Sequence, residues 1–254
     1  MKGKIIAVLP EWLKEWLKKL LLCLRKTKWM LLYQGDKKFC PVCGKSSRQF
    51  VRFKNSEGAR CLYCSALERH RFAWLYLLQK TNLFDGIPKK MLHVAPEHCF
   101  EIKLKELLGD CYLTADLSGS RAMVKMDITN IEYPDQSFDV VYCSHVLEHV
   151  QNDKKALKEF FRVLKNNGWA ILLVPITAEK TFEDDSIITP LERLAAFGQE
   201  DHVRMYGKDY IDRLREAGFH VKVTKVGDLA QNEEAEKMGI ATSAMREIYF
   251  CTKS

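Results

Sequence analysis

Four cysteines in two closely spaced pairs form the most informative pattern in the sequence. Cys40-Pro-Val-Cys43 is followed by 17 residues and then by Cys61-Leu-Tyr-Cys64. Pairs at this spacing can place both sulfurs on one side of a tight turn, and two pairs complete a tetrahedral site. The sequence therefore predicts a zinc ribbon in which these four cysteines bind a structural Zn²⁺ ion, because four thiolates leave no open coordination position. The odd total of nine cysteines argues against a disulfide framework.

Two aspartates follow expected strands further along the chain. Asp116 comes directly after the apolar run 111–115 and lies 21 residues beyond Ala95, which ends an earlier apolar run. That spacing is typical of a carboxylate that accepts hydrogen bonds from both ribose hydroxyls of an adenosine cofactor. Asp127 lies where a third strand would end, and its carboxylate can accept from an adenine amino group. The two positions together predict an adenosine site at the strand ends.

The elements that would position these side chains are strands alternating with helices. Expected strands cover 91–95, 111–115, 138–143, 169–174, 219–226 and 247–252, and expected helices cover 101–108, 153–164 and 208–217. Asn166-Asn167-Gly168 is expected to terminate the second of these helices. Such alternation predicts an α/β fold with a mainly parallel sheet and a ligand crevice at the carboxyl ends of its strands.

Composition and charge narrow the class of protein. The chain has 254 residues, of which 47% are hydrophobic and 29% charged, as in a globular protein with a well-buried core. Residues 1–90 carry 20 Lys/Arg against 6 Asp/Glu, and residues 91–254 carry 20 against 27, so net charges of +14 and −7 sum to +7. The basic first third predicts an anionic partner such as RNA or anionic lipid, with simple solubility as the alternative. With no membrane-span-length apolar run and no secretory leader, we expect a cytoplasmic protein.

Two helices are expected before the main sheet. Residues 10–33 predict a basic amphipathic helix whose apolar face includes Trp12 and Trp16, which is typical of a membrane-surface anchor. The alternative is a helix that packs its apolar face on the same chain or on a second copy. Ser65-Ala-Leu-Glu68 predicts a capping box that opens a helix to about residue 79. Arg69, His70 and Arg71 on this helix are expected either to contact phosphate or to face solvent.

Two further segments carry a family resemblance. They are Phe138-Asp-Val-Val-Tyr-Cys-Ser-His-Val-Leu-Glu-His-Val150 and Phe161-Arg-Val-Leu-Lys-Asn-Asn-Gly168. With them, residues 91–175 resemble class I S-adenosylmethionine-dependent methyltransferases of the ubiquinone/menaquinone-biosynthesis kind. Residues 198–206 and 214–219 resemble the later part of such enzymes, and the first third is more loosely similar to members with a fused zinc ribbon.

The resemblance implies a Rossmann-like sheet of seven strands and S-adenosylmethionine as cofactor. The implied cofactor-binding residues are Val94, Ala95, Pro96, Glu97, Asp116, Leu117, Asp127, Ile128 and Ser144. The chain departs from the family in its first loop, because the usual Gly-x-Gly-x-Gly turn is replaced by His93-Val-Ala-Pro-Glu-His98. A glycine-rich turn exposes backbone amides that bind phosphate, and S-adenosylmethionine has no phosphate. Its ammonium group can instead pair with a carboxylate, so Glu97 is the expected partner.

The resemblance also implies in-line transfer of a methyl group, for which an oxygen nucleophile needs a base. The candidate catalytic residues are His145 and His202, with His149 as the third; for His149 the alternative is a structural role. Arg204 and Tyr206 are expected to bind the acceptor, Arg204 by anchoring an anionic group, and a solvent-exposed Arg204 is the alternative.

These expectations divide the chain into a helix region (1–36), a zinc ribbon (37–66), a linker helix (67–90) and a methyltransferase domain (91–254). The expected acceptor is a hydroxyl of a small molecule or of a glycan- or lipid-linked compound, with the first helix peripheral to the inner face of the membrane. An RNA methyltransferase that binds RNA through its basic first third is one alternative. A non-catalytic zinc-binding module is the other.

Overall fold

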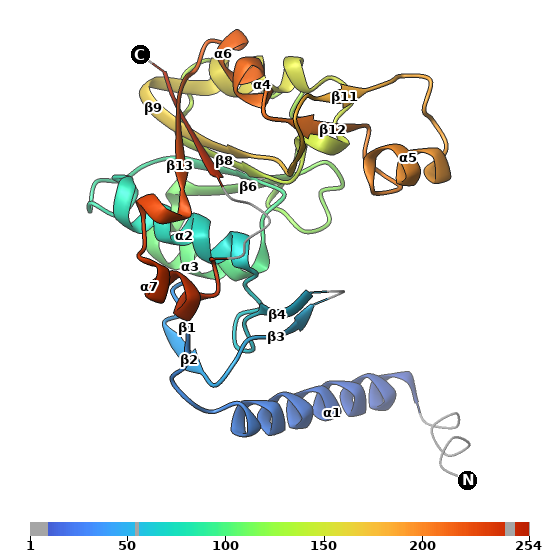
Figure 1. The fold of residues 1–254 in the computed structure, drawn as a ribbon, viewed down its shortest axis with the longest axis vertical. Helices are drawn as coiled ribbons and strands as arrows, with labels where there is room; N and C mark the ends of the chain where they lie inside the picture. Colours follow the sequence, from blue (N-terminus) through green and yellow to red (C-terminus); the bar gives the residue numbers. More distant parts are fainter. Residues whose placement is uncertain (1–9, 54–55, 242–246, 254) are drawn as a thin grey trace.

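The computed structural model describes residues 10–53, 56–241 and 247–253, without the side chains of residue 11 and of residues 21–30. Its centre is a seven-stranded sheet in the order β13-β14-β9-β8-β5-β6-β7 (Figure 1). The strands are β5 (Met91–Val94), β6 (Tyr112–Asp116), β7 (Val124–Lys125), β8 (Phe138–Ser144), β9 (Leu164–Leu173), β13 (His220–Lys225) and β14 (Glu247–Thr252). Strand β14 runs antiparallel to both of its neighbours, β13 and β9, and the other pairs of this sheet are parallel. The predicted α/β class and the seven-stranded sheet are confirmed.

Helices cover both faces of this sheet. In Figure 1, α2 (Glu68–Lys80) and α3 (His98–Leu108) lie on one side, and α4 (Asp153–Val163) and α6 (Tyr210–Glu216) lie on the other. Strand β5 is buried along its whole length, and β8 is buried at every position except Asp139. A strand that is apolar on both faces is the pattern of a central parallel strand covered by two helical layers. The core therefore fixes the carboxyl ends of β5, β6 and β8 side by side.

The junction between α4 and β9 differs from the prediction. Helix α4 ends at Val163 and β9 begins at the next residue, so Asn166-Asn167-Gly168 does not terminate a helix but lies inside the strand. Asn167 has a φ of +63°, and the register of β9 against β8 shifts nearby. A Cβ at Gly168 would lie 2.9 Å from the carbonyl oxygen of Asp139. The three residues thus form an irregularity that brings two strands close together.

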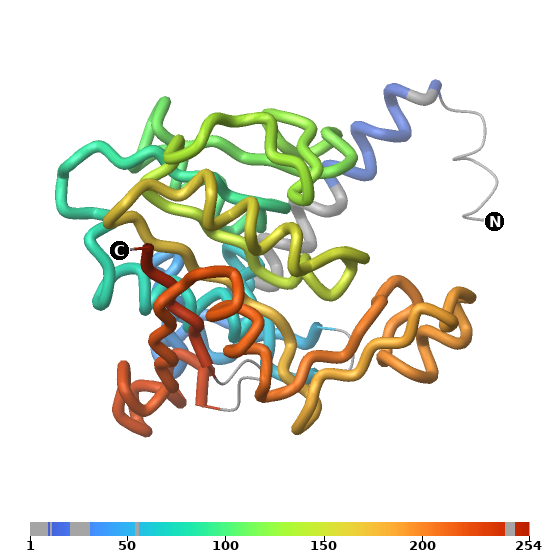
Figure 2. Tube along the Cα trace, turned by 90° about the horizontal axis from the view of Figure 1, so that it is seen from above, coloured from blue at the N-terminus to red at the C-terminus, as the bar shows by residue number. Residues whose placement is uncertain are grey.

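The first third consists of a long helix and two small hairpins. Helix α1 (Glu11–Leu32) leads into β1 (Lys38–Cys40) and β2 (Lys45–Ser47), followed by β3 (Val51–Phe53) and β4 (Ser56–Arg60). Helix α1 extends away from the sheet (Figure 2). Trp12 is 71% exposed and Trp16 is 55% exposed, so packing of this face on the same chain was a wrong expectation for these two side chains. Among the described helices, none has the length and apolarity to cross a bilayer.

A smaller sheet projects from the other end of the main sheet. It is formed by β10 (Ile176–Ala178), β12 (Arg204–Gly207) and β11 (Phe182–Glu183), in that order, with α5 (Pro190–Phe197) between β11 and β12. Thr189 and Glu192 form a capping box that begins α5, and Gly198 ends it with a φ of +84°. The short helix α7 (Asn232–Met238) follows β13 and lies beside β1, where Lys38 Nζ donates to the Glu236 carbonyl at 2.7 Å.

Candidate functional site

The four predicted cysteines converge on one point of the N-terminal module. Sγ of Cys40 lies 3.6 Å from Sγ of Cys64, and Sγ of Cys43 lies 3.8 Å from Sγ of Cys61. All four sulfurs lie within 4.8 Å of one another. Zinc–sulfur bonds of about 2.3 Å in a tetrahedron separate the sulfurs by about 3.8 Å. The spacing of the quartet suits a tetrahedral ion of this size.

Both cysteine pairs are built as the same turn. Gly44 N donates to the Cys40 carbonyl at 2.9 Å, and Ser65 N donates to the Cys61 carbonyl at 3.0 Å. Gly44 has a φ of +68° and Ser65 a φ of +64°. Ser65 therefore closes the second turn and does not cap α2, so the predicted capping box is wrong. The N-cap of α2 is Leu67.

Arg71 fastens this module to the C-terminal part of the chain. It is 0% exposed, so neither expectation for it, phosphate contact or a solvent-facing connector, holds. Its guanidinium donates to four carbonyl oxygens at 2.6–3.0 Å, those of Met238, Gly239, Ala59 and Ala66. It also lies 3.8 Å from the centre of the Phe50 ring. One buried cation thus joins β4, the second cysteine turn and the end of α7.

The tips of β5, β6 and β8 meet at one edge of the sheet. Val94 is in register with Ala115 on one side and with Cys143 on the other, and neighbouring strands are about 4.8 Å apart. Ala95 then turns the chain with a φ of +49°, and its N–H donates to the Ala115 carbonyl at 2.7 Å. Pro96 is buried beneath this turn. A turn without glycine is therefore accommodated at the position predicted for the cofactor.

Asp116 lies at the tip of β6. Its Oδ1 accepts from the Ser118 amide at 2.7 Å and from the Ser118 hydroxyl at 2.6 Å, and these bonds hold the pKa of Asp116 below its usual value. No hydrogen bond to Oδ2 is present within the described residues. The next residue, Leu117, is 67% exposed. Asp116 is thus an ionised carboxylate with one oxygen available at the sheet edge.

The predicted adenine contacts lie beyond β7, the strand next to β6. Asp127 is exposed, and its Oδ1 accepts from the amide and the hydroxyl of Thr129, both at 2.8 Å. Ile128 is 6% exposed and belongs to the core. The Met126 amide donates to the Asp116 carbonyl at 3.1 Å, which ties this segment to the tip of β6.

Glu97 begins α3 and faces inward. Its Oε2 lies 2.7 Å from Nε2 of His93, and its Oε1 lies 3.9 Å from Nε2 of His70. Burial acts to raise the pKa of Glu97, but the hydrogen bond from His93 and the charges of His93 and His70 together outweigh it, and the pKa lies below its usual value. On the far side of His93, Nδ1 lies 2.7 Å from the Tyr112 hydroxyl. Glu97 is therefore an ionised carboxylate held in place by a buried histidine.

Several buried polar atoms near this carboxylate have no hydrogen-bond partner in the described part of the chain. They are Arg69 Nε, His70 Nε2, Tyr142 Oη and Ser144 Oγ. The ring centres of His93 and Tyr142 lie 5.0 Å apart. Burial, together with the charge of Glu97, raises the pKa of Tyr142 well above its usual value, so its hydroxyl stays protonated. Buried polar groups are rarely left without a partner, so these atoms point to an absent ligand.

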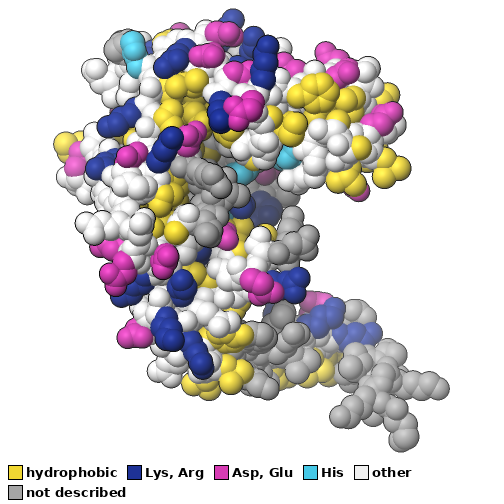
Figure 3. Space-filling view, viewed as in Figure 1, with side chains coloured by type: hydrophobic (Ala, Val, Ile, Leu, Met, Phe, Trp, Pro, Cys, Tyr) yellow, Lys and Arg dark blue, Asp and Glu magenta, His cyan; other side chains and the backbone are white. Residues whose placement is uncertain are grey.

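All three predicted histidines line one pocket of about 640 Å³. His145 and His149 come from the loop after β8, where η3 (Leu147–His149) forms a short turn, and His202 precedes β12. The opposite wall is formed by β3, β4 and the start of α2, including Phe53 and Arg69. Figure 3 shows histidine side chains at the hollow between the upper body and the N-terminal cysteine module. The structure thus brings together the three predicted histidines, which lie up to 57 positions apart in the sequence, from His145 to His202.

Within this pocket His145 is oriented by a carboxylate. Nδ1 of His145 lies 3.4 Å from Oε1 of Glu148, and Nε2 of His145 has no partner among the described residues. His149 and His202 stack edge to face, with ring centres 4.7 Å apart. Burial and the charge of His149 lower the pKa of His202, which favours its neutral form.

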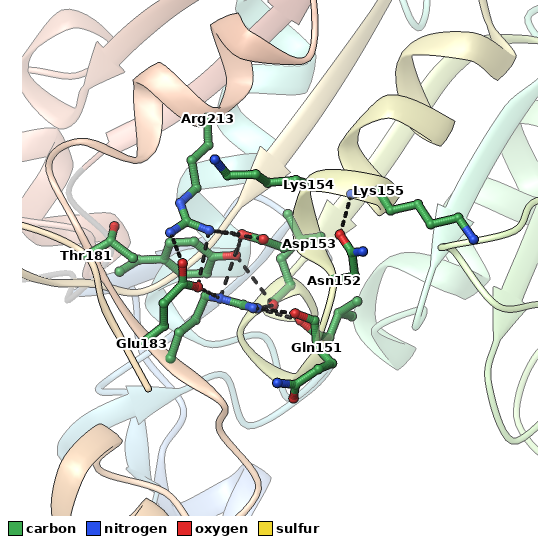
Figure 4. Close-up of polar contacts among 12 residues, drawn as sticks. Gln151, Asn152, Asp153, Lys154, Lys155, Thr181, Glu183 and Arg213 are labelled. Carbon is green, nitrogen blue, oxygen red and sulfur yellow. Dashed lines mark hydrogen bonds and ion pairs between the residues drawn. The ribbon is translucent and has the colours of Figure 1, made fainter. Parts of the chain in front are cut away.

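Arg204 and Tyr206 have structural contacts instead of the expected acceptor contacts. Arg204 is 3% exposed and donates to the carbonyls of Leu147, Val150 and Gln151 and to Glu183, at 2.5–2.9 Å. Tyr206 is 0% exposed and donates to Asp153 Oδ2 at 2.6 Å. Arg213 points toward both Asp153 and Glu183 (Figure 4). The anchor role expected for Arg204 is corrected, because its donors already bind backbone and carboxylate oxygens.

Glu148, His93 and Tyr142 belong to the site but were not predicted from the sequence. His93 is a polar residue inside the otherwise apolar run 91–95, and Glu148 lies between the apolar residues Leu147 and Val150. A polar side chain at a position that the pattern assigns to the core is the available signal, because such a group needs a buried partner. Tyr142 carries no such signal, since tyrosine is common in strands.

Comparison with known proteins agrees with this fold. Residues 91–172 match the family model described as "Methyltransferase domain". The chain is 26% identical over 163 residues to the ajmaline N-methyltransferase of Rauvolfia serpentina, covering 59% of this chain and 55% of that protein. It is 47% identical over 53 residues to the ubiquinone/menaquinone biosynthesis C-methyltransferase of Hydrogenovibrio crunogenus, covering 20% of this chain and 21% of that protein.

A solved structure matches over a longer stretch. An S-adenosylmethionine-dependent methyltransferase from Mesorhizobium loti superposes with a TM-score of 0.51 at 13% identity, covering 72% of this chain and 99% of that one. At this identity the likeness concerns the fold. The chain spans about half or less of the curated relatives named above. The sheet is therefore that of Rossmann-like methyltransferases, and the family match lies on the strands β5 to β9.

Proposed function

We propose that this chain is an S-adenosylmethionine-dependent methyltransferase whose acceptor is a hydroxyl of a small molecule or of a glycan- or lipid-linked compound. The observation that carries the proposal is the edge formed by β5, β6 and β8. There, the ionised carboxylates of Asp116, at the tip of β6, and of Glu97, after the turn that follows β5, lie beside buried polar atoms that have no partner in the described part of the chain. The family match over residues 91–172 supports the same reading.

The residues at this edge fit both parts of the cofactor, the adenosine and the amino acid. Asp116, with Oδ2 available, suits the ribose hydroxyls, and Asp127 with the Ile128 amide suits the adenine ring. Glu97 suits the ammonium of the amino-acid part. Arg69, Tyr142 and Ser144 offer unpartnered donors for its carboxylate. The bound cofactor supplies a methyl group on a sulfonium.

The remaining residues of the turn contribute apolar side chains that shape the proposed cofactor site. Val94 and Ala95 end β5 with small apolar side chains, and Pro96 fills the space beneath the turn. Leu117, exposed beside Asp116, offers an apolar contact for the adenosine. A neutral, apolar turn suits a cofactor without phosphate, because no bare amides are required to bind anionic oxygens.

His145 is the base in this proposal. The carboxylate of Glu148 faces Nδ1 of His145, so the ring can hold a proton on Nδ1 and accept one from the acceptor hydroxyl on Nε2. Glu148 is a positioning residue in this arrangement. The pocket of about 640 Å³ is of the size that binds a small molecule or the head of a larger one.

We propose one role for the cysteine quartet and another for helix α1. We propose that the cysteine quartet binds Zn²⁺ as a structural ion, because its spacing suits four zinc–sulfur bonds. We propose further that α1 lies on an anionic membrane surface. Trp12, Trp16 and Leu20 are exposed on it, as are Lys18 and Lys19. Exposed tryptophans beside lysines suit the boundary between lipid headgroups and acyl chains.

Calorimetric titration with S-adenosylhomocysteine tests the cofactor site. Asp116→Ala is compared with Asp110→Ala, because Asp110 is an exposed aspartate at the opposite end of β6. Removing charge-assisted bonds to two hydroxyls should weaken binding by on the order of 100-fold. Asp110→Ala should bind like wild type. Equal affinities in all three proteins would show that Asp116 does not hold the ribose.

The class of acceptor is tested separately. Cell extract is divided into small-molecule, glycolipid and RNA fractions, and each is incubated with the protein and methyl-labelled S-adenosylmethionine. Label in the first or second fraction is the expected result. Label in RNA, together with RNA binding that weakens steeply as the salt concentration increases, would instead indicate that the basic first third binds RNA. No label together with no cofactor binding would favour a non-catalytic module.

A further inference from the structure

Glu148, His149 and His202 form a second cluster of metal-binding side chains, distinct from the cysteine quartet. One ligand atom of each lies within 4.8 Å of those of the other two. Glu148 and His149 are consecutive in η3, and His202 comes from the loop before β12. The Val203 amide donates to the Glu148 carbonyl at 2.9 Å, so the two segments are fastened together beside the cluster.

The carboxylate of Glu148 is the strongest sign that something is bound here. Glu148 is 2% exposed, and its Oε2 has no hydrogen-bond partner among the described residues. Its other oxygen faces His145 at 3.4 Å. Burying a carboxylate oxygen without a partner is costly, and a cation next to it removes that cost. Arg204 lines the same pocket, but its guanidinium is bound to Glu183 and to three backbone carbonyls.

The two histidines have the surroundings of metal ligands. Nδ1 of His149 lies 3.2 Å from the Asp201 carbonyl and 3.3 Å from Asp201 Oδ2, so Nε2 is left for another partner. His202 has the backbone of Phe197 as a hydrogen-bond partner. Histidines that bind metals usually donate their second N–H to a carboxylate or a carbonyl, which fixes the ring and its tautomer. The remaining nitrogen of each ring can therefore offer its lone pair to an ion that Glu148 also binds.

We propose that Glu148, His149 and His202 bind a divalent first-row transition-metal ion, such as Zn²⁺, Fe²⁺ or Co²⁺, at the wall of the acceptor pocket. Two imidazoles and one carboxylate are a donor set for such ions, and three protein ligands leave positions open for water or substrate. The open positions would face the pocket of about 640 Å³ that the three residues line. Binding of the ion does not depend on the proposed methyl transfer.

The use of the ion follows from its place beside His145. An acceptor hydroxyl bound to the ion is more acidic than a free one. With ion and cofactor bound, Nε2 of His145 would accept the proton of that hydroxyl; its oxygen would form the new C–O bond as the methyl–sulfur bond breaks, and the electron pair of the broken bond would stay on sulfur. This catalytic use of the ion rests on the proposed function, whereas the presence of the metal site does not.

The site is tested by counting metal ions in the full-length chain, without cofactor or acceptor. Purified protein is saturated with Zn²⁺, freed of excess ion and analysed by mass spectrometry, and the expected content is about two ions per chain. His149→Ala, Glu148→Gln and His202→Gln should each contain about one. His220→Gln, which removes an exposed histidine on β13, should match wild type. His149 is exposed, so its variant is expected to fold even if those of Glu148 and His202 do not.

Cobalt distinguishes the two sites spectroscopically. Co²⁺ is added to protein whose cysteine quartet already holds Zn²⁺, and absorption bands of cobalt bound to nitrogen and oxygen, without the intense thiolate-to-cobalt band, should appear at one equivalent. These bands should be lost in His149→Ala and kept in His220→Gln. One zinc ion per chain in wild type, or cobalt bands that persist in all three variants of the cluster, would overturn the proposal. Neither result would bear on cofactor binding.

Discussion

Nε2 of His93 lies 2.7 Å from Oε2 of Glu97, and this buried bond holds a carboxylate at the turn where related sheets have glycines. The bond has a second consequence, because Glu97 also faces His70. Nδ1 of His70 accepts from the Leu67 amide at 3.1 Å and lies 3.3 Å from Sγ of Cys99. His70 is thus surrounded by donors on one side and by a carboxylate on the other.

His70 should make the stability of the protein depend on pH. Burial lowers the pKa of His70 to about 4, against about 6.5 in the unfolded chain. Below pH ~6.5 the unfolded chain therefore binds a proton that the folded chain does not, and stability falls as the pH is lowered toward ~4. The total loss is about 3 kcal/mol. Urea unfolding at pH 7 and pH 5 should show a smaller difference for His70→Gln than for wild type or His220→Gln.

His202 shifts in the same direction, so the His70 variant should keep part of the pH dependence. A pH dependence that is identical in His70→Gln and wild type would show that His70 does not remain neutral in the folded state.

Tyr142→Phe should affect cofactor binding but not the stability of the free protein. The Tyr142 hydroxyl is buried and has no hydrogen-bond partner among the described residues, so its removal should leave the free energy of unfolding unchanged or raise it by about 1 kcal/mol. If the hydroxyl binds the cofactor, affinity for S-adenosylhomocysteine should fall by on the order of 5–10-fold. Thermal unfolding and calorimetry measure the two effects.

Tyr210→Phe is the matched control for this variant. The Tyr210 hydroxyl donates to the Leu172 carbonyl at 3.3 Å, so its loss should reduce stability and leave cofactor affinity unchanged. A Tyr142 variant that behaves like the Tyr210 variant would exclude the hydroxyl from the cofactor site.

Cys64→Ser should prevent binding of the proposed Zn²⁺ ion and loosen a distant helix. Arg71 joins the second cysteine turn, through Ala66, to Met238 at the end of α7. A loss of about 3 kcal/mol would lower the Tm by about 6–12 °C. Hydrogen exchange should increase in α7 as well as in the module. Cys111→Ser, which lies outside the quartet, should change neither, and unchanged exchange in α7 would contradict the coupling.

Arg204→Met should destabilise the protein without changing cofactor affinity. The substitution leaves Asp153, which is 3% exposed, and three carbonyl oxygens with fewer partners (Figure 4). Removing one member of a buried ion pair costs about 3–5 kcal/mol. Lys154→Gln breaks an exposed pair with Glu216 and should cost less than about 1 kcal/mol. A stable Arg204→Met protein with reduced affinity for an anionic acceptor would restore the acceptor contact expected from the sequence.

Helix α1 should bind anionic vesicles through its tryptophans and lysines. The double variant Trp12→Ala/Trp16→Ala should lose most sedimentation with vesicles that contain phosphatidylglycerol. Lys18→Gln/Lys19→Gln should weaken binding by about 2 kcal/mol, and its remaining binding should depend less on salt. Leu191→Ala, which removes a 77% exposed side chain on α5, is the control. Equal sedimentation of wild type with neutral and anionic vesicles would contradict the electrostatic part.

The sequence predicts those features of the site that depend on spacing within one segment. The cysteine pairs and Asp116 at the tip of β6 need only a local turn or a strand end, and the structure places them as such. His145 and His149 follow β8 in one loop, as their spacing implies, whereas His202 reaches the same pocket only because the segment before β12 contacts that loop.

Features that depend on contacts between distant segments were not predictable. Arg71 and Arg204 were expected to contact an anionic group or to face solvent, yet each is buried against backbone carbonyls from other parts of the chain. A single arginine has no periodic pattern that distinguishes a buried guanidinium from a solvent-exposed one. The unpartnered oxygen of Glu148 likewise depends on the loop before β12, which is more than 50 residues away.

The composition of the pocket wall limits how the protein can be divided or recombined. Phe53 and Ala59 belong to the cysteine module, while His145 and His202 belong to the sheet domain, and all four line the same cavity. If this cavity binds the acceptor as proposed, a chimera that receives only residues 91–254 would lack the part of the cavity wall formed by β3 and β4. Exchange of acceptor specificity would then require transplanting the hairpin β3–β4 together with residues 91–254.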